Sequence, residues 1–254
     1  MLSAMSFSFA LHIDIEIMLH SGFRRNGLEK TGMIVRLHNL SSRAPLLSDI
    51  EALVELRIAC DLTDFGCEQV ARKDIEQTWQ ADTFNRSTDA WIVQTRKGLL
   101  VGYADVRVGQ QNEMERVLAS SLYVHPDYRG RGIGTLFTLL TEERARELSL
   151  ALPGRVVLRR EVGTLTVSAH RLLQREAYTL TSCYWRVTFS DEQECLTIDL
   201  PIERADVLQS GQNRTGFYTA QHYSVYEKVV CSGQEPCTEP LVMESVANEP
   251  LATL

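Results

Sequence analysis

Residues 124–135 read Val-His-Pro-Asp-Tyr-Arg-Gly-Arg-Gly-Ile-Gly-Thr and stand between a strand-like run and a helix-like run. The second half of this stretch alternates glycines with arginines, at Arg129, Gly130, Arg131, Gly132 and Gly134. The first N–H groups of a helix have no backbone acceptor and carry about half a positive charge. Glycines let an anion approach that backbone closely, and arginines add charged donors. The stretch therefore predicts a site for a phosphate-like anion at the start of a helix.

The spacing of the glycines excludes two common phosphate-binding motifs. A P-loop requires a lysine followed by serine or threonine after its second glycine, and this stretch contains no lysine. A dinucleotide fingerprint has the spacing Gly-x-Gly-x-x-Gly after the first strand, whereas Gly130, Gly132 and Gly134 alternate and come later in the chain. A tight strand-to-helix turn with solvated arginines and no ligand stays open as the alternative.

Patterns on both sides of this stretch predict a mixed α/β fold around one sheet. Apolar alternation indicates strands at 34–40, 90–95, 99–108, 116–124, 155–162 and 178–189. Helical spacing of apolar residues indicates helices at 49–60, at 72–80, from about Gly132 onward, and at 167–175. Strands and helices that alternate in this order are typical of helices packed against a single mixed sheet.

The composition of the chain indicates which binding partners and which cellular compartment to expect. The chain has 254 residues, a hydrophobic share of 44% and a net charge of -7, as expected for a globular protein that binds neither nucleic acid nor anionic membrane. Its six cysteines form no Cys-x-x-Cys pair and have no histidine at metal-ligand spacing, so we expect no metal site. Nothing marks the chain as secreted, and we expect reduced thiols and a cytoplasmic location.

The two ends of the chain are predicted to lie outside the fold. Residues 1–20 are apolar enough to suggest a signal peptide, but acidic residues interrupt the run and no basic region precedes it, so residues 1–32 are interpreted as a poorly ordered N-terminal extension. From Val229 to the end there are four glutamates, three prolines and no lysine or arginine. We therefore predict an acidic disordered tail at 231–254.

The segment Arg129–Gly134 fits the pattern R-x-x-G-x-G, and the wider run Leu122–Thr135 resembles the GNAT superfamily of acyl-CoA N-acyltransferases. The resemblance extends over about Ile34 to Phe189. It implies one GNAT fold at 33–189, in which a central, mixed and mostly antiparallel sheet is splayed between its two central strands and flanked by helices. The nearest resemblance is to the first lobe of tandem, mycothiol synthase-like proteins, carried by Trp185-Arg-Val. Residues 190–230 could then be the remnant of a second lobe.

The resemblance implies a cofactor and a reaction. Acetyl-CoA is the expected acyl donor, transferred directly to a primary amine of a small molecule or peptide, without a metal. Its pantetheine arm would lie along the motif strand and its pyrophosphate around the glycine loop, which assigns Leu122, Tyr123, Val124, Arg129, Gly130, Arg131, Gly132, Ile133, Gly134 and Thr135 to cofactor binding. An N–H near Val124 is the expected donor to the oxyanion. The partners would be acetyl-CoA and an amine acceptor, and an oligomer is compatible with this function.

The group that takes the proton from the amine is not identified by the sequence. A lysine-like amine with a pKa of about 10.4 must lose a proton, which costs about 4.6 kcal/mol at pH 7. The motif strand carries Ser120 and Ser121 at its centre where many family members have a carboxylate. Nearby acids are Glu113 and Glu115, and the two catalytic candidates are Glu161 and Asp105, each with the alternative of a solvated surface acid.

The closing helix departs from the family pattern N-x-x-A-x-x-L-Y-x-x-x-G-F/Y. Thr166 replaces the asparagine, Leu173 stands where a tyrosine often protonates the leaving thiolate, and Ala177 replaces the glycine. Ala177 would be strained if its backbone has a positive φ. These departures keep a second hypothesis open, a GNAT-fold module that binds CoA or a protein partner but has lost turnover.

Overall fold

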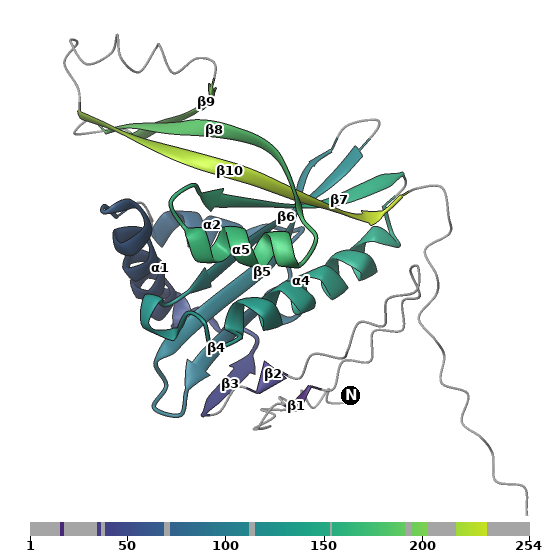
Figure 1. Ribbon diagram of the computed structural model, residues 1–254. Coiled ribbons are helices and arrows are strands. Elements are labelled where there is room, and N and C mark those ends of the chain that lie inside the picture. The colour runs from purple at the N-terminus through teal and green to yellow at the C-terminus, as the bar shows by residue number, and fades with distance from the viewer. Residues whose placement is uncertain are drawn as a thin grey trace, which may run out of the picture.

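The computed structural model is built around one eight-stranded sheet (Figure 1), and it describes residues 16–17, 35–36, 39–68, 72–111, 115–152, 154–190, 195–202 and 217–232. The strand order is β3-β4-β5-β6-β7-β10-β8-β9. These strands are β3 (Leu40–Arg43), β4 (Ala90–Thr95), β5 (Leu100–Gln111), β6 (Glu115–Val124), β7 (Arg155–Gly163), β8 (Thr179–Ser190), β9 (Cys195–Pro201) and β10 (Phe217–Cys231). The helices are α1 (Ile50–Phe65), α2 (Arg72–Gln80), α3 (Arg86–Asp89), α4 (Ile133–Ser149) and α5 (Val167–Arg175).

The predicted splay lies between β6 and β7, the only parallel pair in the described part of the chain. The two strands pair over 115–119 and 155–159, and no register partners follow. Beyond that point β6 continues along β5 as far as Val124, while β7 pairs with β10 from Arg159 to Gly163. The sheet is therefore mixed, mostly antiparallel and open at its centre, which confirms the predicted fold class.

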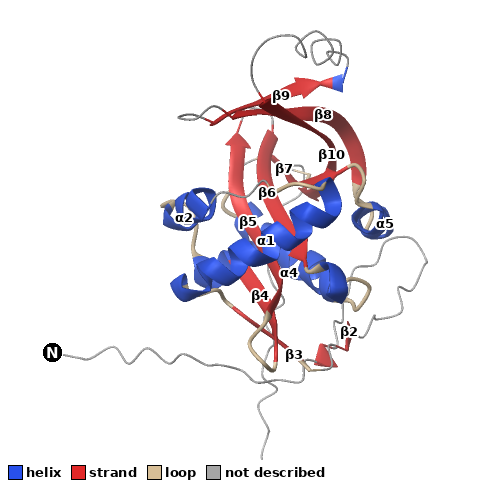
Figure 2. Cartoon of the chain, turned by 90° about the vertical axis from the view of Figure 1, so that its left-hand side faces the viewer, coloured by secondary structure: helices blue, strands red, loops and turns tan. Residues whose placement is uncertain are grey.

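Helices cover both faces of the sheet because strand side chains alternate between the faces. Ile92 and Tyr103 pack with α1 and α2, whereas their neighbours Val93 and Ala104 pack with α4. Figure 2 shows α2 and α5 on opposite sides of β5 and β6. The hydrophobic cores on the two faces of the sheet both extend to the point where β6 and β7 separate. Packed side chains therefore support the open strand edges on both faces.

The N-terminal strand differs from the prediction at 34–40. Val35–Arg36 (β2) pairs only with Glu16–Ile17 (β1), and the strand of the main sheet begins at Leu40 and pairs with β4. Asn39 has a φ of 64°, a left-handed conformation that asparagine tolerates better than most residues. This residue turns the chain between the two short strands, so the predicted single strand is wrong. The rest of the predicted extension at 1–32 lies outside the described residues.

The sheet continues beyond residue 189, where the predicted domain ended. Strand β10 lies between β7 and β8 and pairs antiparallel with both, and β9 extends the edge along β8. The described residues 195–201 and 217–231 therefore belong to the same sheet as 40–190. The interpretation of 190–230 as a remnant of a second lobe stays a prediction, and residues 233–254 of the predicted acidic tail lie outside the described chain.

Replacing Ala177 with glycine is expected to stabilise the protein. Ala177 follows α5 with a φ of 62°, and its N–H donates to the Gln174 carbonyl. A left-handed alanine costs about 1–2 kcal/mol, part of which glycine loses again through unfolded-state entropy. We expect Ala177→Gly to raise the melting temperature by about 2–4 °C. Ala169→Gly, the same exchange inside α5, is the control and is expected to lower it. A lower melting temperature for Ala177→Gly would contradict the backbone assignment.

Candidate active site

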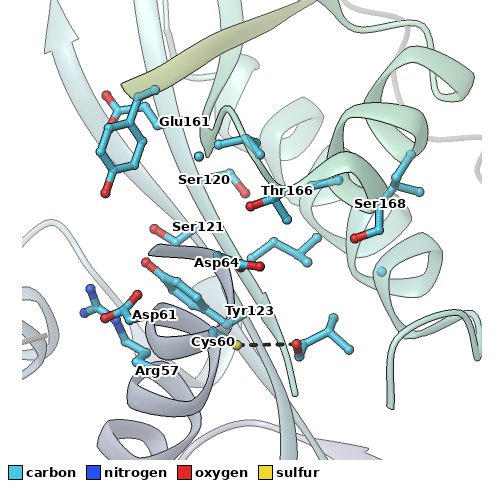
Figure 3. A pocket seen from close by; sticks show the side chains of 18 of the residues that line it. Arg57, Cys60, Asp61, Asp64, Ser120, Ser121, Tyr123, Glu161, Thr166 and Ser168 are labelled. Carbon is cyan, nitrogen blue, oxygen red and sulfur yellow. Dashed lines mark hydrogen bonds between the residues drawn. The ribbon is translucent and has the colours of Figure 1, made fainter. Parts of the chain in front are cut away.

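A cavity of about 1800 Å³ occupies the splay between β6 and β7. Its walls come from α1, β6, the glycine loop, the first turn of α4, β7, α5 and the strands β8 to β10. All of the residues predicted for cofactor binding line it: Leu122, Tyr123, Val124, Arg129, Gly130, Arg131, Gly132, Ile133, Gly134 and Thr135. Figure 3 shows Ser120, Ser121 and Tyr123 along β6, with Thr166 and Ser168 entering from the side of α5. The fold therefore brings the predicted site residues together around one space.

The open edge of β6 presents backbone groups to this cavity. The His125 N–H donates to the Val101 carbonyl of β5 at 3.0 Å. Because backbone groups alternate along a strand, the N–H and C=O of Tyr123 also face β5, while those of Leu122 and Val124 face the opposite edge. On that edge β7 has already diverged. The Val124 carbonyl already accepts from Arg129 and Cys60, so the N–H and C=O of Leu122 and the N–H of Val124 are the groups that face an extended ligand.

The glycine loop ends at the N-terminus of α4. Gly130 and Gly132 have φ values of 77° and 90°, which residues with a Cβ rarely adopt. Gly132 is the N-cap, no side chain caps the helix, and its first turn contains no acid. The N–H groups of Ile133, Gly134 and Thr135 precede the first intrahelical bond, from Leu136 N–H to the Gly132 carbonyl. Such an uncapped, glycine-flanked helix start is suited to an anion.

Gly134 has a packing role as well. A Cβ at this position would meet Leu172 Cδ2 of α5 at 2.9 Å. The absent side chain therefore lets α5 approach the first turn of α4. A substitution at Gly134 is therefore expected to disturb the packing of α5 against α4 as well as the binding of an anion.

The two arginines of the loop differ in what they contact. Arg129 donates from both Nη atoms to the Asp64 carboxylate of α1, at 2.8 and 2.9 Å, and from Nε to the Val124 carbonyl. Burial lowers the pKa of Arg129, but the hydrogen bonds to Asp64, the charge of Asp64 and the contact with Cys60 together raise it above its ordinary value. Arg129 thus ties the loop to α1. Arg131 is exposed and lies 4.6 Å from the ring centroid of Tyr128.

Two arginines that the sequence reasoning missed face the same cavity from α5. Arg175 donates to Thr135 Oγ1 at 2.6 Å, and Arg171 lines the cavity one helical turn earlier. Their spacing of four residues on one helix was the available signal, since it puts both on one face. Arg175, which also pairs with Glu176 at 3.0 Å, thus lies at the start of α4, and Arg131 and Arg171 line the same cavity.

Cys60 contacts the same backbone carbonyl as Arg129. Its Sγ lies 3.3 Å from the Val124 oxygen, the contact drawn as a dashed line in Figure 3. The side chain is buried, and burial raises the pKa of the thiol to about 11. Cys60 therefore acts as a neutral donor that helps to fix the end of β6, and not as a nucleophile.

Alkylation should reveal this raised pKa. Iodoacetamide reacts with the thiolate, whose share falls tenfold for each unit that the pKa lies above the pH. At pH 8 we expect Cys60 to react at least ~100-fold more slowly than a free cysteine peptide, measured by mass spectrometry. Its rate should keep rising about tenfold per unit between pH 8 and 10, where the peptide levels off. Rapid alkylation at pH 8, or a plateau near pH 9, would contradict the assignment.

Glu161, the first of the two catalytic candidates, lies on β7 past the residues that pair with β6, and it lines the cavity. Its Oε2 accepts from the Tyr184 hydroxyl at 2.8 Å and from Arg186 Nη2 at 3.3 Å. Burial and the neighbouring Glu161 carboxylate raise the pKa of Tyr184, so that hydroxyl stays protonated and keeps donating. The side chain of Glu161 is 42% exposed, which leaves it open to the cavity.

Asp105, the second candidate, is buried and held by three groups. It accepts from the Tyr103 hydroxyl at 2.9 Å and the Ser121 N–H at 3.0 Å, and lies 3.3 Å from Arg107 Nε. Trp79 Nε1 donates to the same tyrosine oxygen at 3.1 Å. Asp105 borders a smaller cavity of about 280 Å³ next to the main one. This arrangement makes it a positioning carboxylate for Arg107 and β6, and less suited than Glu161 to meet an amine.

The other positions that the sequence singled out around the reaction are Glu113, Glu115, Leu173 and Ser120. Glu115 pairs with Arg155 at the opposite end of β6, and Glu113 lies outside the described residues. Leu173 is 2% exposed and packs in the core, while its neighbour Leu172 lines the cavity. Ser120 Oγ is buried beside the cavity and has no hydrogen-bond partner among the described residues.

The described residues contain neither a candidate metal-binding group nor a helix that could span a membrane. Within the ranges given above, no group of three or more histidine, cysteine, aspartate or glutamate side chains could hold a metal ion. Over the same ranges, none of the helices is long and apolar enough to cross a membrane.

Comparison with known proteins gives one family match, over part of the chain. Residues 86–177, from α3 to the end of α5, match the model of the acetyltransferase (GNAT) domain. Sequence match and fold together support the GNAT acetyltransferase superfamily. No curated protein matches the chain significantly. The narrower resemblance to mycothiol synthase-like tandem proteins is not confirmed and stays a prediction.

Solved structures show the same GNAT fold at low sequence identity. The GCN5-related N-acetyltransferase from Sphaerobacter thermophilus superposes with a TM-score of 0.59 at 15% identity, over 80% of this chain and 99% of that one. The structure of yncA from Salmonella typhimurium with its cofactor acetyl-CoA gives a TM-score of 0.50 at 14% identity, over 78% and 98%. These similarities show the fold alone, over about four fifths of the chain.

Proposed function

We propose that this GNAT domain is an acetyl-CoA-dependent N-acyltransferase that transfers the acetyl group directly to a primary amine of a small molecule or peptide. The observation that carries the proposal is the continuous path from the open edge of β6 to the uncapped N-terminus of α4. A strand edge and a helix start in series suit a ligand with an amide-containing arm followed by a pyrophosphate. The family match and the acetyl-CoA of the Salmonella structure support the same cofactor.

The residues present fit this cofactor. The edge N–H and C=O of Leu122 would hold the pantetheine arm as an added strand, next to the Val124 N–H. The first N–H groups of α4 would hold the pyrophosphate, with Arg131, Arg171 and Arg175 as charged partners. A Cβ at Gly132 would be strained at its φ of 90°, as expected where backbone must approach an anion closely.

The chain then supplies three functions around the reacting carbonyl. Acetyl-CoA, when bound, supplies a thioester whose carbon forms a bond to the amine nitrogen as its bond to sulfur breaks. The Val124 N–H is the proposed donor to the carbonyl oxygen as negative charge develops there. Glu161 is the proposed acceptor of the amine proton, directly or through one water. Because Leu173 has no proton to donate, solvent is the proposed source of the proton for a thiolate with a pKa near 8.5.

Because Leu173 is buried and has no proton to donate, the second hypothesis, a GNAT-fold module that binds CoA or a protein partner without turnover, stays open. A GNAT-fold domain without a general acid could bind acetyl-CoA and turn it over weakly or not at all. In either case the composition supports a cytoplasmic protein that does not bind nucleic acid or membranes, and this is part of the proposal.

Thiol release from acetyl-CoA, measured across a panel of primary amines, tests the function. The enzyme hypothesis expects release that depends on at least one amine and saturates with its concentration. The acetylated amine should appear in equal amount by mass spectrometry. If acetyl-CoA raises the melting temperature but no amine stimulates release, the binding-module hypothesis replaces the enzyme.

A further inference from the structure

The main cavity and the smaller cavity beside it meet at a set of charged residues. Seven residues line both cavities: Arg57, Asp74, Arg107, Ser121, Tyr123, Glu161 and Arg186. Tyr123 belongs to the segment of β6 on which the acyl group would be delivered, so this junction is where an acceptor has to lie. The charged residues at this junction therefore indicate which chemical class of acceptor can bind there.

Two of these arginines already have carboxylate partners. Arg186 donates to both oxygens of Asp199 at 2.9 Å and also to Glu161. Arg107 lies 3.3 Å from Asp105 and donates from Nη2 to Ser121 Oγ at 2.6 Å. Their charges are thus balanced within the protein, and they mainly fix the walls of the junction.

Arg57 is different. It makes no ion pair with any residue that the structure describes, and its Nε is buried without an acceptor. Its guanidinium carbon lies 5.0 Å from the ring centroid of Tyr123, and the side chain is half-buried. A cation–π contact uses none of the N–H donors of the guanidinium in a hydrogen bond, and the structure shows no hydrogen bond from Arg57 to a described residue. A charged fork with unused donors at a cavity wall is complementary to a carboxylate.

We infer that the acceptor is an amine that also carries a carboxylate, an amino acid in the broad sense, and that Arg57 binds this carboxylate. The inference rests on the proposed function, since it assigns a role to the acceptor end of the same cavity. Arg57 binds the carboxylate beside Tyr123, and Glu161 on the other wall receives the proton of the amino group. The junction then holds both charges of a zwitterionic acceptor, and an uncharged amide in place of the carboxylate leaves Arg57 without its partner.

The test compares amino acids with their own carboxamides. The twenty standard L-amino acids and the matching amino acid amides are assayed by acetyl-CoA-dependent thiol release, with kcat and KM measured for each active pair. For the wild type we expect kcat/KM at least ~10-fold higher for the acid than for its amide. Arg57→Gln should remove this preference by raising KM for the acid, while kcat/KM for the amide changes less than about twofold. Arg57→Lys should retain part of the preference, because it keeps the charge without the planar fork.

The control is Arg96→Gln, an exposed arginine in the β4–β5 hairpin that lines neither cavity, and it should keep the preference. Amides that are used as well as the acids, or an Arg57→Gln variant that loses activity equally on both, would overturn the inference while the acyltransferase function stands. Melting temperatures of all variants identify a loss that comes from misfolding, and in that case the comparison of acid with amide in the wild type decides. Absence of release with every amine would overturn the proposed function and this inference with it.

Discussion

Replacing Gly134 with aspartate is expected to abolish the stabilisation that acetyl-CoA gives to the wild-type protein. At a concentration of 100 times its Kd, a ligand stabilises the folded state by about 2.7 kcal/mol. For a chain of this size that corresponds to a rise in melting temperature of about 5–10 °C. Aspartate in the first turn of α4 would itself accept from the free N–H groups and repel a second anion. We expect affinity to fall by ~100-fold or more, so the rise should disappear at the same concentration.

The matched control for this variant is Gly134→Ala. It introduces the same Cβ, 2.9 Å from Leu172 Cδ2, but no charge. Its own melting temperature should fall as in the aspartate variant, whereas most of the acetyl-CoA shift should remain. Equal loss of the shift in both variants would assign Gly134 to packing between α4 and α5. A shift that persists in Gly134→Asp would show that the anion binds elsewhere.

Exchange of Glu161 for glutamine is expected to lower kcat by about 10²–10⁴-fold at neutral pH, as for the loss of a general base. The variant keeps the size of the side chain and an oxygen that can accept from Tyr184 and Arg186. It should therefore keep its melting temperature to within a few degrees and the full shift with acetyl-CoA. The measurement is the steady-state rate of thiol release with the best amine of the panel.

Glu143→Gln on α4 is the control for loss of a carboxylate. Glu143 pairs with Arg146 on the surface and lines neither cavity. Its activity should stay within about twofold of the wild type. A Glu161→Gln enzyme with unchanged kcat would exclude Glu161 as the base and leave Asp105, another residue or solvent in that role.

The sequence was most informative where one local feature determines one structure. The glycine loop was correctly placed at the start of α4, because it lies between an alternating apolar run and a run with helical spacing, whereas its binding of an anion stays a prediction. Apolar periodicity located α2 and α5 at the residues observed. The sequence raised a positive φ at Ala177 only as a condition, from the glycine of the family pattern, and the structure has it at 62°.

Features that depend on distant pairing could not be predicted in this way. Strand β10 enters the sheet between β7 and β8 after a long excursion along the chain, and no local pattern carries that information. The partner of Arg129 is Asp64, 65 residues earlier, so its role as a tie to α1 becomes visible only in the fold. The same holds for Asp105, whose carboxylate is occupied by Tyr103, Ser121 and Arg107.

Amide hydrogen exchange at single-residue resolution, measured by NMR with and without acetyl-CoA, tests the central claim most directly. The claim is that the arm of the cofactor binds the open edge of β6 and its pyrophosphate binds the first turn of α4. We expect exchange to slow at Leu122, Val124 and Ile133 to Thr135, while Tyr123, whose N–H faces β5, changes little. Unchanged exchange at these amides under saturating acetyl-CoA, or slowing confined to other elements, would contradict the account.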